Sequence, residues 1–357
     1  MISPAKTINK LFIGSSKKSA KDNTTVIEIT NRSDNTGLIT TQNTRNYKGV
    51  IVNPVFEDNV YTEKSSYLLR EVSVTVSNAS GDSYVLVKNK MTITGSKFIG
   101  IQQDLFTIKL QNINFASFAK AVNKGYKIIV VKVEDAIVFV GTIKTINTGR
   151  ESIVEKSIEL KCLMKVTDLL SDMVSPITVN SSANIWAILG EVTGQDLLVG
   201  NIPEDFKYLK FEEEYTFSGY KKTVVDDIMS IVNDQLNRTN NKNLPWIDYV
   251  YEQDGTVNLF SPYTIKEVLN IQPYTGLIDT PTISEDSVSF NSIYKYKLVP
   301  GRVVFLDNAL FNTLGNASAF VYGWDPAGLY VITEVRYSLS NYPSTYNCSV
   351  KARTLSK

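Results

Sequence analysis

Apolar and polar residues alternate along several segments of the chain with the two-residue period of a half-buried β-strand. Phe106, Ile108 and Leu110 alternate with the polar residues between them, so one face of this segment is expected to be buried. Residues 157–162 show the same alternation. Both segments therefore predict strands of a sheet that covers a core.

A hairpin is predicted between these two strands. Residues 126–133 and 136–146 are rich in β-branched and aromatic residues, and only Glu134 and Asp135 separate the two runs. That spacing favours a tight turn. A second hairpin is predicted for residues 246–251 and 257–260, which flank Asp254-Gly255, because Asp-Gly tolerates a positive φ.

The middle of the chain has helical instead of strand periodicity. Apolar residues at i, i+3, i+4 and i+7 form three stripes, which predict core-facing helices and not cofactor sites. The stripes are Val166, Leu169, Leu170 and Met173; then Ile185, Ile188, Leu189 and Val192; then Val225, Ile228, Met229, Val232 and Leu236. A further short helix is predicted after Asn114 as N-cap, with Phe115, Phe118, Ala119 and Val122 on one face and an end near Gly125.

An internal repeat links two distant parts of the chain. The segment from Gly125 to Cys162 resembles the segment from Gly301 to Ala352. Each copy has a strand that begins after a glycine, a central strand and an alternating closing strand. In this alignment residues 138–142 match 329–333, and Leu160-Lys161-Cys162 matches Val350-Lys351-Ala352.

These patterns predict a β-rich α+β chain with two similar β-barrel-like domains and a mixed helical region between them. The expected units are an N-terminal arm or small appended unit at 1–83 and a first barrel-like domain at 84–164. A mixed helix and hairpin region at 165–285 and a second barrel-like domain at 286–357 follow.

Charge and hydropathy exclude several kinds of partner. Lys and Arg number 37 against 36 Asp and Glu, so the formal net charge is +1, and no strong overall field attracts nucleic acid or an anionic membrane. The longest apolar runs, 128–131 and 137–140, are far shorter than the roughly 20 residues of a membrane-spanning helix. The first 22 residues lack the pattern of a secretory signal.

The absence of histidine removes two large groups of catalytic sites. Without an imidazole there is no Ser-His-Asp or Cys-His nucleophile, and two cysteines alone cannot close a tetrahedral zinc site. Neither a phosphate-binding loop nor a dinucleotide-binding glycine motif is present. No cofactor, metal or catalytic residue is expected, and Cys162 and Cys348 are interpreted as reduced core residues.

Clustered carboxylates are the remaining catalytic candidates. Glu212, Glu213 and Glu214 form one cluster, and Asp226 with Asp227 forms another. Paired carboxylates could support glycoside hydrolysis. Because both clusters consist of adjacent acids expected on exposed segments, solvated surface charge is the favoured interpretation.

The order of several segments resembles that of the central hub proteins of phage baseplates, across roughly residues 84–357. This family includes the T-even hub, the Mu hub, the late-control D proteins and the N-terminal part of type VI secretion spikes. The segments that carry the resemblance are Asn123-Lys124-Gly125-Tyr126, residues 137–143, the helix and hairpin that end at Asp254-Gly255, residues 298–304 and residues 328–335.

The resemblance implies a structural protein and not an enzyme. Such hubs form homotrimers whose two barrel-like domains per chain imitate a six-fold tail-tube ring and enclose a channel. The implied partners are other copies of the chain, the tail tube protein, the central spike protein, baseplate wedge proteins and the tape-measure protein, with DNA only in transit and no membrane insertion. The implied location is the tail baseplate of a virion, assembled in the cytoplasm of the host bacterium.

Two features depart from the family pattern. The first 80 or so residues have no counterpart in it, and no lytic or peptidase extension follows the last barrel, so cell-wall digestion is expected of another protein. Asn308, Tyr322 and Trp324 lie in a long loop of the second copy, residues 307–327, and are the candidate assembly contacts.

Two alternatives stay open. Another ring-forming tail component, such as a distal tail or tube-initiator protein, also uses β-barrel rings. A tail-associated glycan hydrolase or glycan-binding protein is the alternative from a different class, because Trp324 could stack on a sugar.

Overall fold

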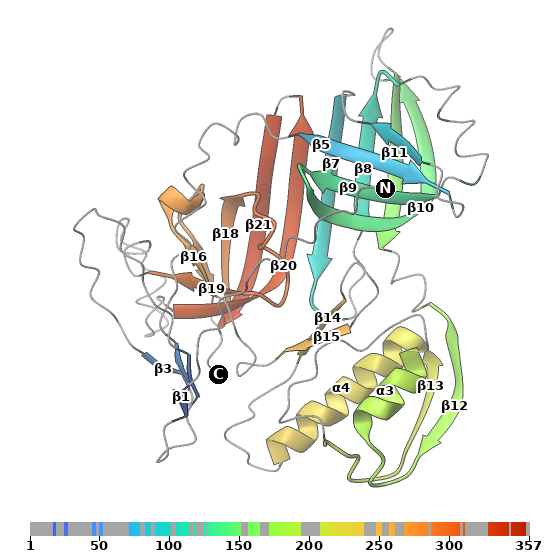
Figure 1. Ribbon diagram of the computed structural model, residues 1–357, viewed down its shortest axis with the longest axis vertical. Helices are drawn as coiled ribbons and strands as arrows, with labels where there is room; N and C mark the ends of the chain where they lie inside the picture. The colour runs from blue at the N-terminus through green and yellow to red at the C-terminus, as the bar shows by residue number, and fades with distance from the viewer. Residues whose placement is uncertain are drawn as a thin grey trace, which may run out of the picture.

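The fold is known from a computed structural model of the full chain. The structure describes residues 17–18, 25–27, 45–47, 50–52, 71–78, 83–86, 90–100, 105–113, 118, 125, 127–150, 156–164, 171–193, 208–238, 248–251, 257–260, 268–284, 287–307, 310, 328–342 and 344–354. Strands dominate this part of the chain (Figure 1). The prediction of a β-rich α+β chain is therefore confirmed.

One sheet of 13 strands forms most of the described structure. Eleven strands follow the order β17-β18-β21-β20-β7-β8-β11-β10-β9-β5-β6, and β19, which also carries β16, pairs with β20. Its members are β5 (Val72–Ser77), β6 (Ser83–Leu86), β7 (Lys90–Phe98), β8 (Leu105–Gln111), β9 (Ile128–Val133), β10 (Ala136–Arg150), β11 (Lys156–Met164), β16 (Val268–Ile271), β17 (Thr282–Ser284), β18 (Ser287–Ile293), β19 (Val303–Leu306), β20 (Gly328–Asn341) and β21 (Ser344–Thr354). All pairs are antiparallel except β16 with β19.

A small separate sheet precedes the main one. It contains β1 (Lys17–Lys18), β2 (Thr25–Ile27), β3 (Arg45–Tyr47) and β4 (Val50–Val52), in the order β1-β2-β4-β3. Within the described residues these strands pair only with one another.

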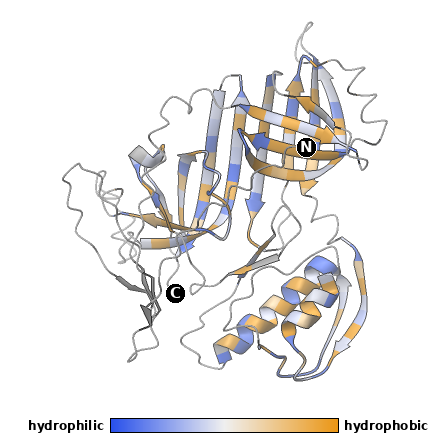
Figure 2. Cartoon of the chain, in the orientation of Figure 1, coloured by the Kyte–Doolittle hydropathy of each residue, from blue (hydrophilic) through white to orange (hydrophobic). Residues whose placement is uncertain are grey.

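Alternation in the sequence corresponds to alternation in burial. Phe106, Ile108 and Leu110 of β8 are fully buried, and Leu160 and Cys162 of β11 face the same core. Figure 2 shows the corresponding alternation of apolar and polar residues along the strands. Both Cys162 and Cys348 are buried and neither forms a disulfide, and burial raises the pKa of Cys162 to about 12, as expected of core residues.

The predicted hairpin forms as β9 and β10. Glu134 and Asp135 are the two turn residues, and Glu134 has a φ of 55°. Beyond residue 143, β10 continues as an extension that pairs with β11 only, within the described structure. The central strand is therefore much longer than β9.

The internal repeat is a repeat of strand pairing. Strands β7, β8, β11, β10 and β9 pair in the same order as β17, β18, β21, β20 and β19. In both copies the central strand carries a bulge where it passes its shorter neighbour, after Ile143 in β10 and after Ile332 in β20. Ile143 donates its N–H to the Lys127 carbonyl and Ile332 to the Arg302 carbonyl, each at 2.8 Å. We refer to these five-stranded sets as the first and second units.

This register corrects part of the sequence alignment. Because Ile143 corresponds to Ile332, the central strands were matched two positions away from their true equivalence. The closing strands were matched correctly, since Ile143 lies opposite Cys162 and Ile332 lies opposite Ala352. Gly125 and Gly301 both have a positive φ, 85° and 83°, at the entry to their units.

The pairing corrects the expectation of two separate barrels. Within the described residues the two units share one continuous sheet, and strand pairing closes neither unit into a complete barrel. Strands outside 84–164 and 286–357 also belong to this sheet, since β5 pairs with β9 and β16 pairs with β19. The domain boundaries stay predictions.

A separate α/β region contains two helices on a two-stranded sheet (Figure 1). Its elements are β12 (Met173–Val179), α3 (Ile185–Thr193), β13 (Tyr215–Tyr220) and α4 (Lys221–Arg238). The second and third apolar stripes are confirmed as the buried sides of α3 and α4. Asn184 caps α3 by accepting hydrogen bonds from the N–H groups of Trp186 and Ala187 at 3.0 and 3.1 Å.

The prediction of a helix from the first apolar stripe is wrong at its last residue, Met173. Met173 opens strand β12 and is exposed, because β12 pairs with β13 from Met173 onward. The rest of that stripe lies outside the described residues, as does most of the helix predicted after Asn114. Phe118, which belongs to that predicted helix, is helical and buried.

The second predicted hairpin is observed as β14 (Asp248–Tyr251) and β15 (Val257–Phe260). Asp254-Gly255 lies outside the described residues. The short 3-10 helix η3 (Pro273–Thr275) follows β16 and ends at Gly276. No helix in the described part of the chain is long and apolar enough to cross a bilayer.

Gly95 provides a test of packing in the first unit. A Cβ at this position would lie 2.4 Å from Cδ1 of Phe106, so Gly95→Ala should lower the free energy of unfolding by about 1–3 kcal/mol. Gly190→Ala in α3 is the matched control, because no atom lies within 4 Å of its added Cβ and alanine favours a helix by about 0.5–1 kcal/mol. Urea denaturation should give opposite signs; two equal effects would contradict this packing.

Candidate assembly surface

The two units meet where β20 changes partner. Its first part, up to Ile332, pairs with β19 of its own unit. After the bulge, residues 334–340 pair with β7 of the first unit, from Glu334 opposite Phe98 to Ser340 opposite Thr92. Strands more than 200 positions apart in sequence thus become neighbours in one sheet, and we call this contact the unit junction.

Aromatic rings pack beneath the unit junction. The ring centroid of Phe106 lies 4.2 Å from that of Phe139 and 5.8 Å from that of Tyr337. Tyr337 lies directly opposite Gly95, which has no side chain to compete for the space. The space over Gly95 is filled by the Phe106 ring, and Tyr337 of the second unit stacks against that ring.

Buried polar groups fix the register of the unit junction. The Tyr337 hydroxyl donates to the carbonyl of Leu298 at 3.1 Å within the second unit, and two other contacts cross the junction. The N–H of Met91 donates to Oδ1 of Asn341 at 2.8 Å, and the Ser340 hydroxyl donates to the carbonyl of Met91 at 3.2 Å. Because a shift in register would leave these buried groups unpaired, the junction has one favoured alignment.

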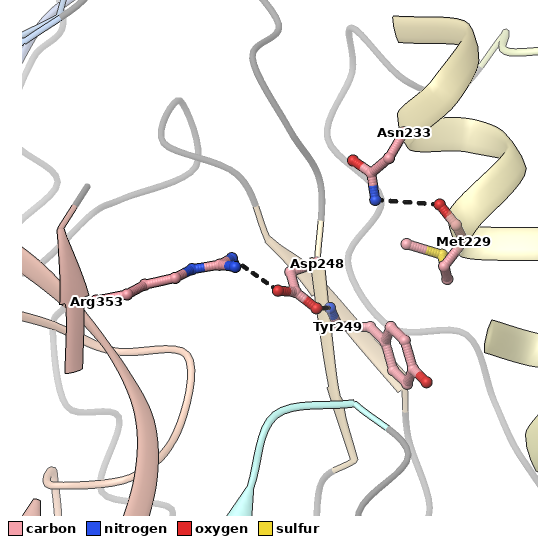
Figure 3. A network of polar contacts seen from close by, with 5 residues as sticks. All are labelled: Met229, Asn233, Asp248, Tyr249 and Arg353. Atoms are coloured by element: carbon pink, nitrogen blue, oxygen red, sulfur yellow. Dashed lines mark hydrogen bonds and ion pairs between the residues drawn. The ribbon is translucent and has the colours of Figure 1, made fainter. Parts of the chain in front are cut away.

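The hairpin β14–β15 connects the α/β region to the main sheet (Figure 3). Arg353 on β21 donates from Nη2 to Oδ2 of Asp248 at 2.8 Å. The next residue, Tyr249, is buried and donates its hydroxyl to Oδ1 of Asp226 on α4. Gly100, which follows β7, donates its N–H to the carbonyl of Tyr249 at 3.1 Å. One hairpin strand therefore contacts both units and helix α4.

Both carboxylates of this connection have raised pKa values. The pKa of Asp226 is raised to about 6, mainly by burial and further by the charges of Asp227 and Asp248, while Lys222 opposes the rise. Burial also raises the pKa of Asp248 to about 6, against the lowering effect of Arg353. Desolvation of the charged form is thus the main cause at both positions.

The carboxylate clusters differ from their predicted environments. Glu212, Glu213 and Glu214 are exposed, as expected of surface charge, and so is Asp227. The expectation that Asp226 is exposed is wrong, because Tyr249 covers it. No group of three potential metal ligands occurs among the described residues.

The three predicted assembly contacts, Asn308, Tyr322 and Trp324, lie outside the described residues. Of their loop, Asp307 accepts a hydrogen bond at its carbonyl from the N–H of Leu310 at 3.1 Å. Sequence reasoning missed the unit junction and the contacts of Asp248. No local motif indicates either one, because the partners are 105 or more positions apart.

The raised pKa of Asp226 predicts a pH dependence of stability. The folded chain retains a proton up to about pH 6, whereas an unperturbed Asp loses it near 3.8. Because the folded state binds more protons in this range, the contribution of Asp226 to stability should fall as the pH rises from about 4 to 6. Asp226→Asn should flatten the dependence of the free energy of unfolding on pH, as measured by urea denaturation. Asp227→Asn, at an exposed position, should change this dependence less. An unchanged slope in Asp226→Asn would contradict the assignment.

Comparisons with known proteins give structural matches only. No protein-family model and no curated protein matches the sequence. Among solved structures, the tail protein from Neisseria meningitidis MC58 has 12% identity and a TM-score of 0.48, covering 80% of this chain and 96% of that one. The 43 kDa tail protein of prophage MuSo2 from Shewanella oneidensis has 8% identity and a TM-score of 0.48, covering 80% and 98%.

A third match is the E. coli c3393 protein, with 13% identity, a TM-score of 0.47 and coverage of 75% of this chain and 74% of that one. It is described as a component of the type VI secretion system with structural similarity to the T4 bacteriophage tail proteins gp27 and gp5. All three matches are to proteins described as tail or secretion-system components.

Proposed function

We propose that this chain is a structural hub subunit of a phage tail baseplate or a related contractile injection device. Three chains form a ring that joins the six-fold tail tube to the three-fold central spike and encloses the channel for DNA. The observation that carries this proposal is the repeat itself: two units with the same strand order lie edge to edge in one sheet.

A repeated unit has a direct use in matching symmetries. A tube ring of six identical subunits presents six equal docking positions. Three chains with two similar units each present six similar positions around the same axis while keeping three-fold symmetry for a spike. The continuous sheet supports this role, because it holds both units of a chain side by side.

The remaining features of the chain are consistent with a conduit. A net charge of +1 gives no strong overall attraction for a polyanion, which suits a channel that passes DNA and the tape-measure protein without retaining them. Wedge proteins would contact the outside of the ring. In this proposal the chain has no catalytic role, and its site of action is the tail baseplate of the virion.

The number of chains per particle tests the proposal. Light scattering of the full chain alone should give three times the chain mass of 39.9 kDa, and its complexes with tube and spike partners should contain three copies of the chain. A monomer under all these conditions would exclude a hub. A ring of six chains would favour a distal tail or tube-initiator protein instead, and release of fragments from host peptidoglycan would favour the glycan hydrolase.

The long loop of the second unit is the proposed contact with the tube, through Asn308, Tyr322 and Trp324. Trp324→Ala should leave the trimer intact and weaken its binding to tube rings by about 30-fold, the effect of losing one aromatic hot spot worth about 2 kcal/mol. Co-sedimentation of the trimer with preformed tube rings measures this loss of affinity. Tyr208→Ala is the control, because Tyr208 is 82% exposed in the α/β region. Equal binding by both variants would remove Trp324 from the interface.

A further inference from the structure

The unit junction joins an edge of β20 to an edge of β7. Because the two units have the same strand order, each unit also contains a counterpart of the edge that the other unit uses. At the junction, the second part of β20 pairs with β7. By the equivalence of the units, residues Thr145 to Arg150 of β10 correspond to Glu334 to Leu339 of β20, and β17 corresponds to β7. The first unit therefore has its own copy of the β20 edge, and the second unit has its own copy of the β7 edge.

The copied edge on β10 has no strand partner in the described structure. Residues 145–150 pair with β11 on one side, and β9 ends before them on the other. All six residues are exposed, including apolar Ile146 at 36%. Their counterparts at Val335, Tyr337 and Leu339 are buried where β7 and the first unit cover them. The same strand segment is thus covered in one unit and uncovered in the other.

The copied edge on β17 is the end of the sheet. Within the described residues β17 pairs with β18 only. Its residues Thr282 and Ser284 are exposed, and Ile283 points into the core. Unpaired N–H and C=O groups on such an edge are a template for another strand.

We propose that β17 of one chain pairs antiparallel with residues 145–150 of a second copy, in the register of the unit junction. Tyr337 faces Gly95 and Arg336 faces Ser96 at the junction. The equivalent pairs between chains are Thr148 with Ile283, Asn147 with Ser284 and Gly149 with Thr282. The inference rests on the proposed function, because it names the partner that closes the proposed ring.

The side chains at the new contact complement each other in size. Within the chain a large residue, Tyr337, lies opposite a glycine, Gly95. Between chains the order is reversed, because the smaller Thr148 lies opposite the larger Ile283. Each pair joins one small and one large residue on the buried side of the sheet, so both contacts can fill a similar space.

The two copied edges are different surfaces of one chain, so the contact is head-to-tail. Such an interface forms a closed ring when its rotation closes and a filament when it does not. If the contact between chains repeats the unit junction, each unit in the ring pairs with the next one in the same way, both within a chain and between chains. The occupant of each edge is therefore a second copy of this chain.

Cysteine cross-linking tests the register. In a chain carrying both Asn147→Cys and Ser284→Cys, facing Cβ atoms of neighbouring copies would lie about 5 Å apart. A short reagent with two thiol-alkylating groups, which forms thioethers, should therefore give covalent trimers on a reducing gel. A mixture of the two single variants should give covalent dimers only. Native Cys162 and Cys348 are buried and should not react.

The matched control is the pair Asn147→Cys with Ser83→Cys. Ser83 is also an exposed serine, on β6 at the opposite end of the sheet. Trimers that fail to cross-link through 147 and 284, or that cross-link equally through 147 and 83, would overturn this inference and leave the hub proposal intact. A chain that stays monomeric with its tube and spike partners would overturn both. Covalent ladders longer than three chains would confirm the edges and exclude a closed trimer.

A second variant tests the edge without cysteines. Ile146→Lys places a charge at an exposed position of β10, so the chain should still fold, with an unchanged circular dichroism spectrum, but should lose the trimer. Val85→Lys is the control, because Val85 is exposed on β6. A trimer that survives Ile146→Lys would contradict the contact.

Discussion

The structure depends on one contact, the pairing of the second part of β20 with β7. It turns two five-stranded units into a single sheet, and its register is fixed by the contacts of Ser340 and Asn341 with Met91. Gly95 leaves room for the Phe106 ring, and Tyr337 stacks on that ring, so the aromatic cores of the two units merge. Without this contact the units would be separate modules, and neither their spacing nor their common orientation would be fixed.

The same contact explains why two edges of the chain are left over. A unit that pairs through one edge with its neighbour must present the complementary edge on its other side. In this chain those edges are residues 145–150 and β17. The β14–β15 hairpin then fixes the α/β region to the sheet through Asp248 and Tyr249, so helix α4 is placed relative to both units.

The sequence predicts local structure well and long-range pairing poorly. Alternation at Phe106, Ile108 and Leu110 and the apolar stripes of α3 and α4 determine those elements, because burial there follows the period of a single segment. The repeat can be detected in the sequence, because Gly125 and Gly301 begin similar segments and the closing strands of the two segments match. Its central strands were misaligned by two positions, because such a shift preserves the alternation of buried and exposed residues along a strand. The unit junction and the ion pair of Asp248 with Arg353 join residues far apart in sequence, so no local pattern indicates them.

The central claim concerns how copies of this chain meet, and electron cryomicroscopy of the assembled full-length chain tests it most directly. We expect three chains with six similar units in a ring, in which β17 of each chain continues the sheet at residues 145–150 of the next, with Ser284 opposite Asn147. A ring of six chains, or a trimer in which these two edges lie apart, would contradict it.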